Sequence, residues 1–373
     1  MIAGPNIVTI DLSALIRNLG QVKDIIGRDV RIMGVVKSDA YGHGLLGIGR
    51  ALEKNGVDCL GVAYLHEALA LRTGGVRLPV VILCGIHTRE ESRQVLAKGL
   101  TPVIYDLEVA EILAQECRRQ GRKIRAQLKV DTGMGRLGVP WNQLGPFLER
   151  MISFKNLEIE ALVSHLASAD EADPRFSELQ VERFEKAISM GRSYALPLKR
   201  NSMANSAGLM VSKKTHFDMV RPGIMLYGGL PSPDFVSPVP LASVMGLSAQ
   251  VVQVRDLPDR TPVSYGRTYV TQGPRTIAVI SAGYGEGLPR ALSNRGKVLI
   301  GGQERDIVGR VCMNLTACDI TGHHGVTRGD EAVFLGTQGG SCIRGDDMAG
   351  CAGTISYEVF CAIGGKNIRK YVT

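Results

Sequence analysis

Short apolar runs alternate with segments of helical periodicity between about residue 30 and residue 226 of the chain. The runs predicted to be strands are Arg31–Val36, Cys59–Ala63, Val80–Leu83, Thr101–Tyr105, Ile124–Val130, Ile159–Ser164, Arg200–Met203 and Met219–Leu226. The clearest helical segments between them are Leu45–Asn55, Leu65–Thr73, Glu90–Lys98, Leu107–Gln120 and Glu178–Leu196. Repeated alternation predicts a parallel sheet, and eight units favour a closed (β/α)8 TIM-type barrel over an open doubly wound sheet.

The pattern changes near residue 231, where four prolines crowd the connection Leu230–Pro240. The short runs that follow are separated by Gly, Pro and Asp and have little helical periodicity before about Met348. They are Leu247–Val254, Thr276–Ser281, Lys297–Ile300, Thr316–Ile320 and Glu331–Leu335. We therefore expect a barrel over residues 1–240 and a mostly-β domain over residues 241–373, against which the extreme N-terminus could pack.

Length, composition and charge narrow the class of protein. The chain has 373 residues, of which 45% are hydrophobic and 21% charged, as in an ordinary globular enzyme of two domains. Its formal charge of +8 comes from scattered Lys and Arg, so we expect an anionic small ligand and no nucleic acid.

The cysteines and the N-terminus indicate the compartment. Eight dispersed cysteines without zinc-ligand spacing are typical of reduced thiols, and no metal is expected, even at His323-His324. Met1–Thr9 lacks the charged and apolar regions of a signal peptide, and no apolar stretch is long enough to cross a membrane. These features predict a cytoplasmic protein.

Reactive side chains follow several of the predicted strands, at the end of a barrel where active sites form. Lys37 ends an apolar run, which favours a neutral amine able to form a Schiff base, although a strand-end lysine can also simply extend to solvent. His165, Asn205-Ser206 and the segment Arg221-Pro222-Gly223-Ile224 follow later strands. Ser206 could bind phosphate or cap a helix, and the backbone amides of Gly223 and Ile224 could also hold phosphate.

The stretch Val35-Val36-Lys37-Ser38-Asp39-Ala40-Tyr41-Gly42-His43-Gly44 resembles the cofactor-lysine signature of the alanine racemase family. The resemblance continues in order along nearly the whole chain. It recurs in Leu128–Arg136, Ser164-His165, Asn205-Ser206, Arg221-Pro222-Gly223, Ser264-Tyr265-Gly266, Gly283-Tyr284, Gly309–Met313 and Thr354–Glu358. Any one of these matches could arise by chance, but the collinear set identifies the family.

The resemblance implies that Lys37 carries pyridoxal 5'-phosphate as an aldimine and moves the substrate α-proton on one face. It implies that Tyr265 of the partner subunit in a homodimer acts on the other face, as racemisation by two bases requires. The activity implied is interconversion of L- and D-alanine, which supplies D-alanine as a peptidoglycan precursor.

Other positions match residues around the cofactor in the family. Arg221 matches the arginine at the pyridine nitrogen, and His165 matches a histidine that links this arginine to the tyrosine. The matches to the phosphate cradle are Tyr41, Ser206, Gly223, Ile224 and Tyr357. Arg136 matches an arginine near the cofactor phenol and substrate carboxylate, and Lys129 matches a lysine that many members carry as a carbamate.

Three further residues match the substrate side of the family's site: Met313 near the substrate carboxylate, Tyr284 in the entry corridor, and Asn314. At this last position the family usually has Asp, so the substitution favours a serine or broad-specificity racemase as the alternative. A decarboxylase of the same cofactor class would place a carboxylate where Arg221 stands. A non-catalytic cofactor carrier would lack the domain that contains Tyr265.

Overall fold

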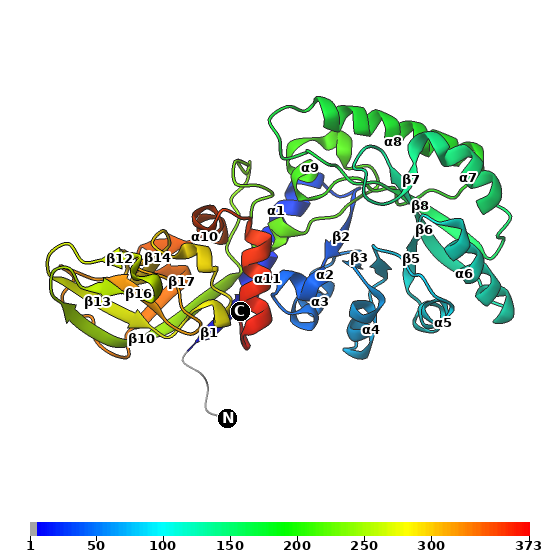
Figure 1. The fold of residues 1–373 in the computed structure, drawn as a ribbon. Helices are drawn as coiled ribbons and strands as arrows, with labels where there is room; N and C mark the ends of the chain where they lie inside the picture. The colour runs from blue at the N-terminus through cyan, green and yellow to red at the C-terminus, as the bar shows by residue number, and fades with distance from the viewer. Residues whose placement is uncertain (1–5) are drawn as a thin grey trace.

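The computed structural model describes residues 6–373, which form a parallel barrel and a mostly-β domain joined side by side (Figure 1). Residues 1–5 lie outside the described residues. They include part of Met1–Thr9, on which the signal-peptide expectation rests, and the start of the predicted barrel domain. Among residues 6–373, no helix is both long and apolar enough to cross a bilayer. This part of the chain also brings together no cluster of three or more potential metal ligands.

The barrel strands are parallel and hydrogen-bonded in chain order. They are β2 (Arg31–Val35), β3 (Cys59–Val62), β4 (Val80–Ile82), β5 (Thr101–Ile104), β6 (Ile124–Asp131), β8 (Leu157–Val163) and β9 (Met219–Val220). The ring closes because β9 pairs with β2, and Ser202 bridges Val163 of β8 to Met219 of β9. The predicted (β/α)8 architecture is therefore confirmed, and the single residue Ser202 takes the place of the seventh strand.

Two of the predicted barrel strands are wrong in extent. Arg200–Met203 is reduced to the single bridging residue Ser202, because the Leu162 amide bonds the side-chain Oδ1 of Asn201 at 3.0 Å in place of a main-chain carbonyl. Met219–Leu226 ends as a strand at Val220, since Pro222 has no N–H to donate. The residues beyond it form a 3-10 turn, η3 (Ile224–Tyr227).

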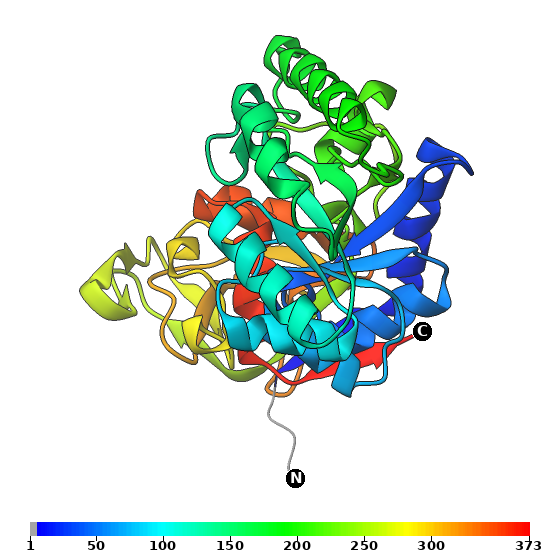
Figure 2. The same cartoon turned by 90° about the vertical axis from the view of Figure 1, so that its right-hand side faces the viewer.

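Helices cover the outside of the barrel, which faces the viewer in Figure 2. They are α1 (Leu12–Ile26), α3 (Leu45–Lys54), α4 (Leu65–Thr73), α5 (Arg89–Lys98), α6 (Leu107–Arg119), α7 (Leu144–Met151), α8 (Arg175–Ser193) and α9 (Ser206–Val211). Their starts are set by local chemistry, as where Thr88 and Glu91 form a capping box on α5. Buried Asn18 of α1 bonds the carbonyls of Leu226 and Ala242 and so ties this helix to the exit from the barrel.

The second domain is built on one long strand, β10 (Met245–Leu257). Around it the sheet runs β15-β14-β17-β10-β1-β19, and in addition β13 pairs with β10, β16 with β13, and β18 with β17. The bounds are β1 (Ile7–Asp11), β13 (Arg275–Ile280), β14 (Lys297–Ile300), β15 (Gln303–Asp306), β16 (Thr316–Asp319), β17 (Glu331–Gln338), β18 (Ser341–Ile343) and β19 (Arg369–Val372). Strands from both ends of the chain, β1 and β19, therefore pair within this sheet.

A small hairpin and two helices complete the β domain. The hairpin joins β11 (Pro262–Val263) to β12 (Tyr269–Val270) through a 3-10 turn at Tyr265–Arg267. The helices are α10 (Gly345–Ala352) and α11 (Ser356–Lys366), and α11 lies between the β domain and the barrel (Figure 1).

Helix α11 contacts the barrel at the turn α2 (Lys37–Tyr41) and the residue after it. A Cβ built on Gly364 would lie 1.8 Å from the carbonyl oxygen of Gly42, and one on Gly42 would lie 2.2 Å from that of Phe360. Only glycine permits this approach, so the two domains meet backbone to backbone beside Lys37.

We predict opposite effects for two neighbouring glycines of α11. Gly364→Ala should lower the free energy of unfolding by about 1–3 kcal/mol, because the new methyl group collides with the Gly42 carbonyl. Gly365→Ala is the matched control: it faces open space and should raise stability by up to about 1 kcal/mol through helix propensity. Urea unfolding measures both, and equal effects would contradict the close approach.

Candidate active site

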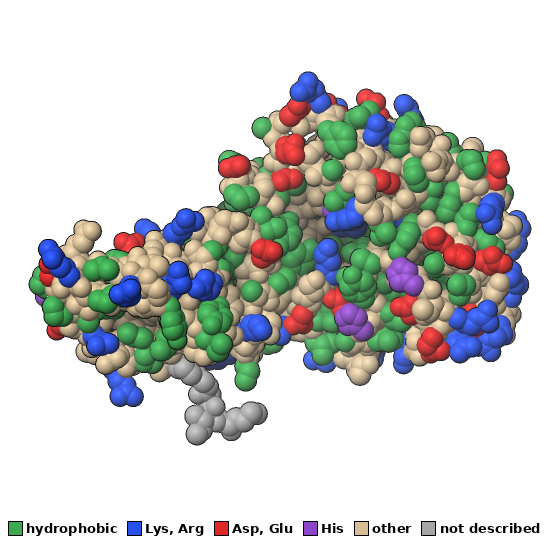
Figure 3. All heavy atoms as spheres, viewed as in Figure 1, with side chains coloured by type: hydrophobic (Ala, Val, Ile, Leu, Met, Phe, Trp, Pro, Cys, Tyr) green, Lys and Arg blue, Asp and Glu red, His purple; other side chains and the backbone are tan. Residues whose placement is uncertain are grey.

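A cavity of about 670 Å³ opens at the carboxyl ends of the barrel strands. Nine residues matched by the family resemblance line it together with Lys37: Tyr41, Lys129, Arg136, His165, Ser206, Arg221, Gly223, Ile224 and Tyr357. The space-filling view shows Lys and Arg side chains within the hollowed region on this side of the barrel (Figure 3). Strands β2, β6, β8 and β9 thus bring together residues that are scattered through more than 180 positions of sequence.

The charge of this cavity is one-sided. Lys37, Lys129, Arg136 and Arg221 line it, whereas none of the described lining residues is Asp or Glu. Burial and the neighbouring Arg136 lower the pKa of Lys37, and burial beside Arg221 lowers the pKa of Lys129 well below its usual value. Such a cavity favours neutral amines and an anionic ligand.

Arg221 is held rigidly at the floor of the cavity. Its Nη1 donates to Ser202 Oγ at 2.6 Å, and its Nη2 donates to the carbonyls of Ser164 at 2.6 Å and Met203 at 3.1 Å. Burial lowers the pKa of this guanidinium to about 10, so it remains charged at neutral pH.

His165 is the acceptor in its contact with Arg221. Its Nδ1 lies 3.3 Å from Nη2 of Arg221, and a guanidinium can only donate. Burial and the surrounding cations hold the pKa of His165 well below 6.5, so the ring is neutral. Its one proton therefore sits on Nε2, free to be donated to another group.

A small cradle of hydroxyl and amide groups lies at one end of the cavity. Ser206 Oγ accepts hydrogen bonds from the Gly223 amide at 3.0 Å and from the Met225 amide. A Cβ at Gly223 would lie 2.4 Å from the Tyr41 hydroxyl, so glycine allows this hydroxyl to approach the backbone. Burial raises the pKa of Tyr41 and Tyr357, which keeps both as hydrogen-bond donors.

Lys37 leads into an unusual stretch of backbone. The four residues Ser38–Tyr41 have φ between 54° and 55°, a left-handed helical turn made without glycine. This conformation costs about 1–2 kcal/mol per residue for L-amino acids. Strain of this kind gathers at functional sites and persists only where neighbouring groups fix it.

The remaining predicted residues lie outside this cavity, on the surface of the β domain. Tyr265, Tyr284, Met313 and Asn314 are all exposed, with Tyr265 at 72%. Hydrogen bonds to main-chain carbonyls bring their segments together. The Tyr284 amide donates to the Cys312 carbonyl at 3.0 Å, and Ser264 Oγ donates to the Arg310 carbonyl. We call these four residues the β-domain cluster. In one chain they do not line the cavity that contains Lys37.

Asn314 has a partner within the β-domain cluster's own turn. Its Nδ2 donates to Glu286 Oε1 at 2.8 Å, while Oε2 of the same carboxylate accepts from the Gly283 amide at 2.9 Å. An aspartate at position 314 would instead face Glu286 as a like charge. The amide therefore fits this local arrangement.

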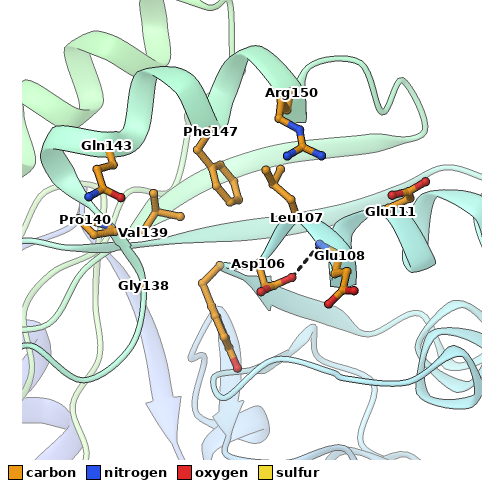
Figure 4. Close-up of a pocket in the computed structure, with 11 residues that line it drawn as sticks. Asp106, Leu107, Glu108, Glu111, Gly138, Val139, Pro140, Gln143, Phe147 and Arg150 are labelled. Atoms are coloured by element: carbon orange, nitrogen blue, oxygen red, sulfur yellow. Dashed lines mark hydrogen bonds between the residues drawn. The ribbon is translucent and has the colours of Figure 1, made fainter.

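A second hollow lies between α6 and α7 and carries no comparable set of groups. It shares Tyr105 with the cavity and is lined by Asp106, Glu108, Glu111 and Arg150 among others (Figure 4). The Asp106 carboxylate is already used to cap α6, where it accepts from the Glu108 amide at 2.7 Å. The chemistry of the molecule is concentrated in the cationic cavity.

Several residues that shape the cavity carry no distinctive signal in the sequence. Tyr64, Cys84, His87 and Tyr105 line it, and buried Glu67 accepts from the amide of Ser38, next to Lys37. Glu67 accepts from the amide of Tyr64, the N-cap of α4, but the Tyr64 side chain makes no reciprocal capping bond, so the usual Ser/Thr-x-x-Glu signal is missing from the sequence.

Comparison with known proteins decides the family. Models of two domain families match this chain: "Alanine racemase, N-terminal domain" over residues 10–231 and "Alanine racemase, C-terminal domain" over residues 244–371. The chain belongs to the alanine racemase family. An alanine racemase of Syntrophobacter fumaroxidans is 40% identical over 364 residues, covering 98% of this chain and 96% of that protein. One of Geobacter sulfurreducens is 40% identical over 372 residues, covering 99% and 97%.

Solved structures of the family have the same fold as this chain. The alanine racemase of D-cycloserine-producing Streptomyces lavendulae is 31% identical with a TM-score of 0.93, covering 100% of this chain and 98% of that one. The alanine racemase of Bartonella henselae, solved with covalently bound pyridoxal phosphate, is 31% identical with a TM-score of 0.89. Coverage in that case is 99% of this chain and 100% of the other.

The depressed pKa of Lys129 generates a prediction for stability. Between its folded pKa and about 10.5 the unfolded chain binds a proton that the folded chain does not, so stability rises with pH in this window. Lys129→Met should remove up to about 1.4 kcal/mol per pH unit of this rise in bicarbonate-free buffer. Unfolding free energies between pH 7 and pH 10 measure it, with exposed Lys123→Met as the control. Parallel pH profiles for wild type and Lys129→Met would contradict the assignment.

Proposed function

We propose that this protein is a pyridoxal-phosphate-dependent alanine racemase, an isomerase that interconverts L- and D-alanine. The observation that carries the proposal is the strand-end Lys37 in a cationic cavity with no carboxylate among its described lining residues. Full-length relatives at about 40% identity are alanine racemases by name. The same relationship supports the wider role of supplying D-alanine as a peptidoglycan precursor in the cytoplasm.

The residues of the cavity fit pyridoxal phosphate. Tyr41, Ser206, Tyr357 and the amides around Gly223 and Ile224 are the phosphate-binding set, because they place donors around a space that only glycine leaves open. Arg136 would bind the phenolic oxygen, and Lys37 would hold the cofactor covalently through Nζ. When bound, the cofactor withdraws electrons from the substrate and so acidifies its α C–H bond.

Lys37 and Arg221 have complementary roles at this site. The lowered pKa of Lys37 favours the neutral form of its amine, which could accept the α-proton on the face that it occupies. Arg221, charged and fixed by three hydrogen bonds, would face the ring nitrogen of the bound cofactor and oppose its protonation. A carboxylate at that place would favour the opposite protonation state and decarboxylase chemistry, so we exclude that class.

Tyr265 of the partner subunit is the base for the opposite face in this proposal. In one chain Tyr265 is 72% exposed on the β-domain cluster, away from the cavity, so it is available to a second copy. The Nε2–H of His165 then connects Arg221 to the tyrosine oxygen. A homodimer with shared sites, in which residues 241–373 supply the tyrosine, completes the pair of bases.

The β-domain cluster also supplies the substrate side of the site. Met313 offers backbone near the substrate carboxylate, Tyr284 lines the entry, and Asn314 presents an amide where the family usually has a carboxylate. An amide can donate to a substrate hydroxyl, which favours serine or a broader range as the alternative. Since its Nδ2 donates to Glu286, we expect alanine to be preferred.

We predict that purified protein loaded with pyridoxal phosphate racemises L-alanine faster than L-serine or L-lysine. Borohydride reduction followed by peptide mapping should place the pyridoxyl group on Lys37, and Lys37→Ala should lose both the label and the activity. Chiral chromatography measures the rates, and exposed Lys123→Ala is the control. A label on another lysine, or no loss of chirality with any of the three substrates, would refute the proposal.

We predict that inactive variants of the two bases complement each other. Lys37→Ala and Tyr265→Ala homodimers should each be nearly inactive, but co-expression produces heterodimers with one doubly altered site and one intact site. Random pairing makes half of the dimers mixed, so activity should recover to about a quarter of wild type. If both bases came from one chain, no pairing would restore a site. Mixed dimers without recovered activity would therefore rule out the shared site.

A further inference from the structure

The left-handed turn Ser38–Tyr41 directly follows Lys37, so the direction of the lysine depends on whatever holds the turn. Four consecutive non-glycine residues with positive φ do not adopt this conformation by themselves. Hydrogen bonds within the turn, such as that from the Ala40 amide to the Val36 carbonyl, stay inside it and do not fix its position. The groups that do so must come from elsewhere.

The first external group comes from the barrel. Glu67, in the first turn of α4 and 6% exposed, accepts from the Ser38 amide through Oε1 at 2.5 Å. Its Oε2 accepts from the Ala63 amide at 2.7 Å and the Tyr64 amide at 3.2 Å. This carboxylate therefore fixes the start of the turn to the end of β3.

The second group comes from the β domain, 330 positions away in sequence. Arg369, the first residue of β19, donates from Nη1 to Asp39 Oδ2 at 2.5 Å and to the Gly42 carbonyl at 3.2 Å. Asp39 Oδ1 at the same time accepts from the Leu45 amide at 2.7 Å, at the start of α3. Arg369 thus holds the middle and the end of the turn together.

Close contacts beside Arg369 leave β19 little room to move relative to the turn. The Tyr371 hydroxyl donates to the His43 carbonyl at 3.1 Å, and a Cβ on Gly44 would lie 1.9 Å from that hydroxyl. Buried His43 stacks on Tyr227 at 4.5 Å between ring centroids. The strand therefore cannot slide along the turn without collision.

We propose that Arg369 is a positioning residue for the cofactor lysine. Through Asp39 and the Gly42 carbonyl it stabilises the left-handed turn and so directs Lys37 into the cationic cavity. This inference rests on the proposed function of Lys37 as the cofactor-binding residue. The contact between β19 and the turn would therefore affect how well the barrel binds its cofactor.

An ordinary surface ion pair would not have this effect, because such pairs contribute little to stability. Arg369 is different in that its side chain is 21% exposed and bonds both a carboxylate and a main-chain carbonyl of a strained turn. Loss of the guanidinium should therefore loosen the turn locally and leave the global melting temperature nearly unchanged.

The test compares Arg369→Gln with Arg369→Lys, which keeps the charge, and with Lys370→Gln, an exposed neighbour on the same strand. In cofactor-free protein, hydrogen exchange of the peptide covering residues 38–44 should become on the order of tenfold faster in Arg369→Gln. The Kd for pyridoxal phosphate should rise about tenfold, as expected for one charge-assisted hydrogen bond. Arg369→Lys should recover part of both effects, and Lys370→Gln should match wild type.

The outcomes separate this inference from the proposed function. Unchanged exchange and affinity in Arg369→Gln, with normal labelling of Lys37 in wild type, would overturn the positioning role alone. Faster exchange with unchanged affinity would also overturn it, because the turn would then not direct the lysine. A wild-type chain that took up no pyridoxal phosphate on Lys37 would overturn both. Asp39→Asn combined with Arg369→Gln should have a smaller effect than the sum of the two single effects, because the two variants remove one shared hydrogen bond, and fully additive effects would contradict a direct pair.

Discussion

The structure depends on a concentration of like charge at the mouth of the barrel. Four cationic residues line the cavity there: Lys37, Lys129, Arg136 and Arg221. None of the described residues that line it is Asp or Glu. Isolated buried cations are unfavourable, so the amines tend to lose their protons and the guanidinium of Arg221 needs its three fixed acceptors. The same arrangement that costs stability in the empty chain creates affinity for an anionic cofactor and keeps an amine neutral for proton transfer.

Much of the fold could be predicted from hydrophobic periodicity, because strands buried on both faces and amphipathic helices leave strong local patterns. Helix α4 was predicted to the residue, and most barrel strands to within one or two positions. The errors fall at Arg200–Met203, where an asparagine side chain accepts one ladder hydrogen bond, and after Val220, where Pro222 has no N–H to donate one. Periodicity records which residues are apolar and carries no information about such replacements.

The candidate site was predicted less evenly. Residues with distinctive chemistry in short motifs, such as Lys37 and Arg221, could be found because strand ends collect them on one side of the barrel. Glu67 and Arg369 could not be found in this way, because each is important through a contact with a strained turn. The contact of Arg369 with Asp39 also spans 330 positions of sequence. A backbone conformation such as that of Ser38–Tyr41 leaves little trace in residue type, because none of its members is glycine.

The pairing of β1 with β19 makes the barrel an insertion into the β domain, and this has a consequence during synthesis. During translation β1 is made more than 230 residues before its partner β10, and β19 is made later still. The barrel strands are complete well before that. Translation therefore completes the barrel strands while the lysine turn still lacks its outer support, and this support comes only when the strand bearing Arg369 has been made.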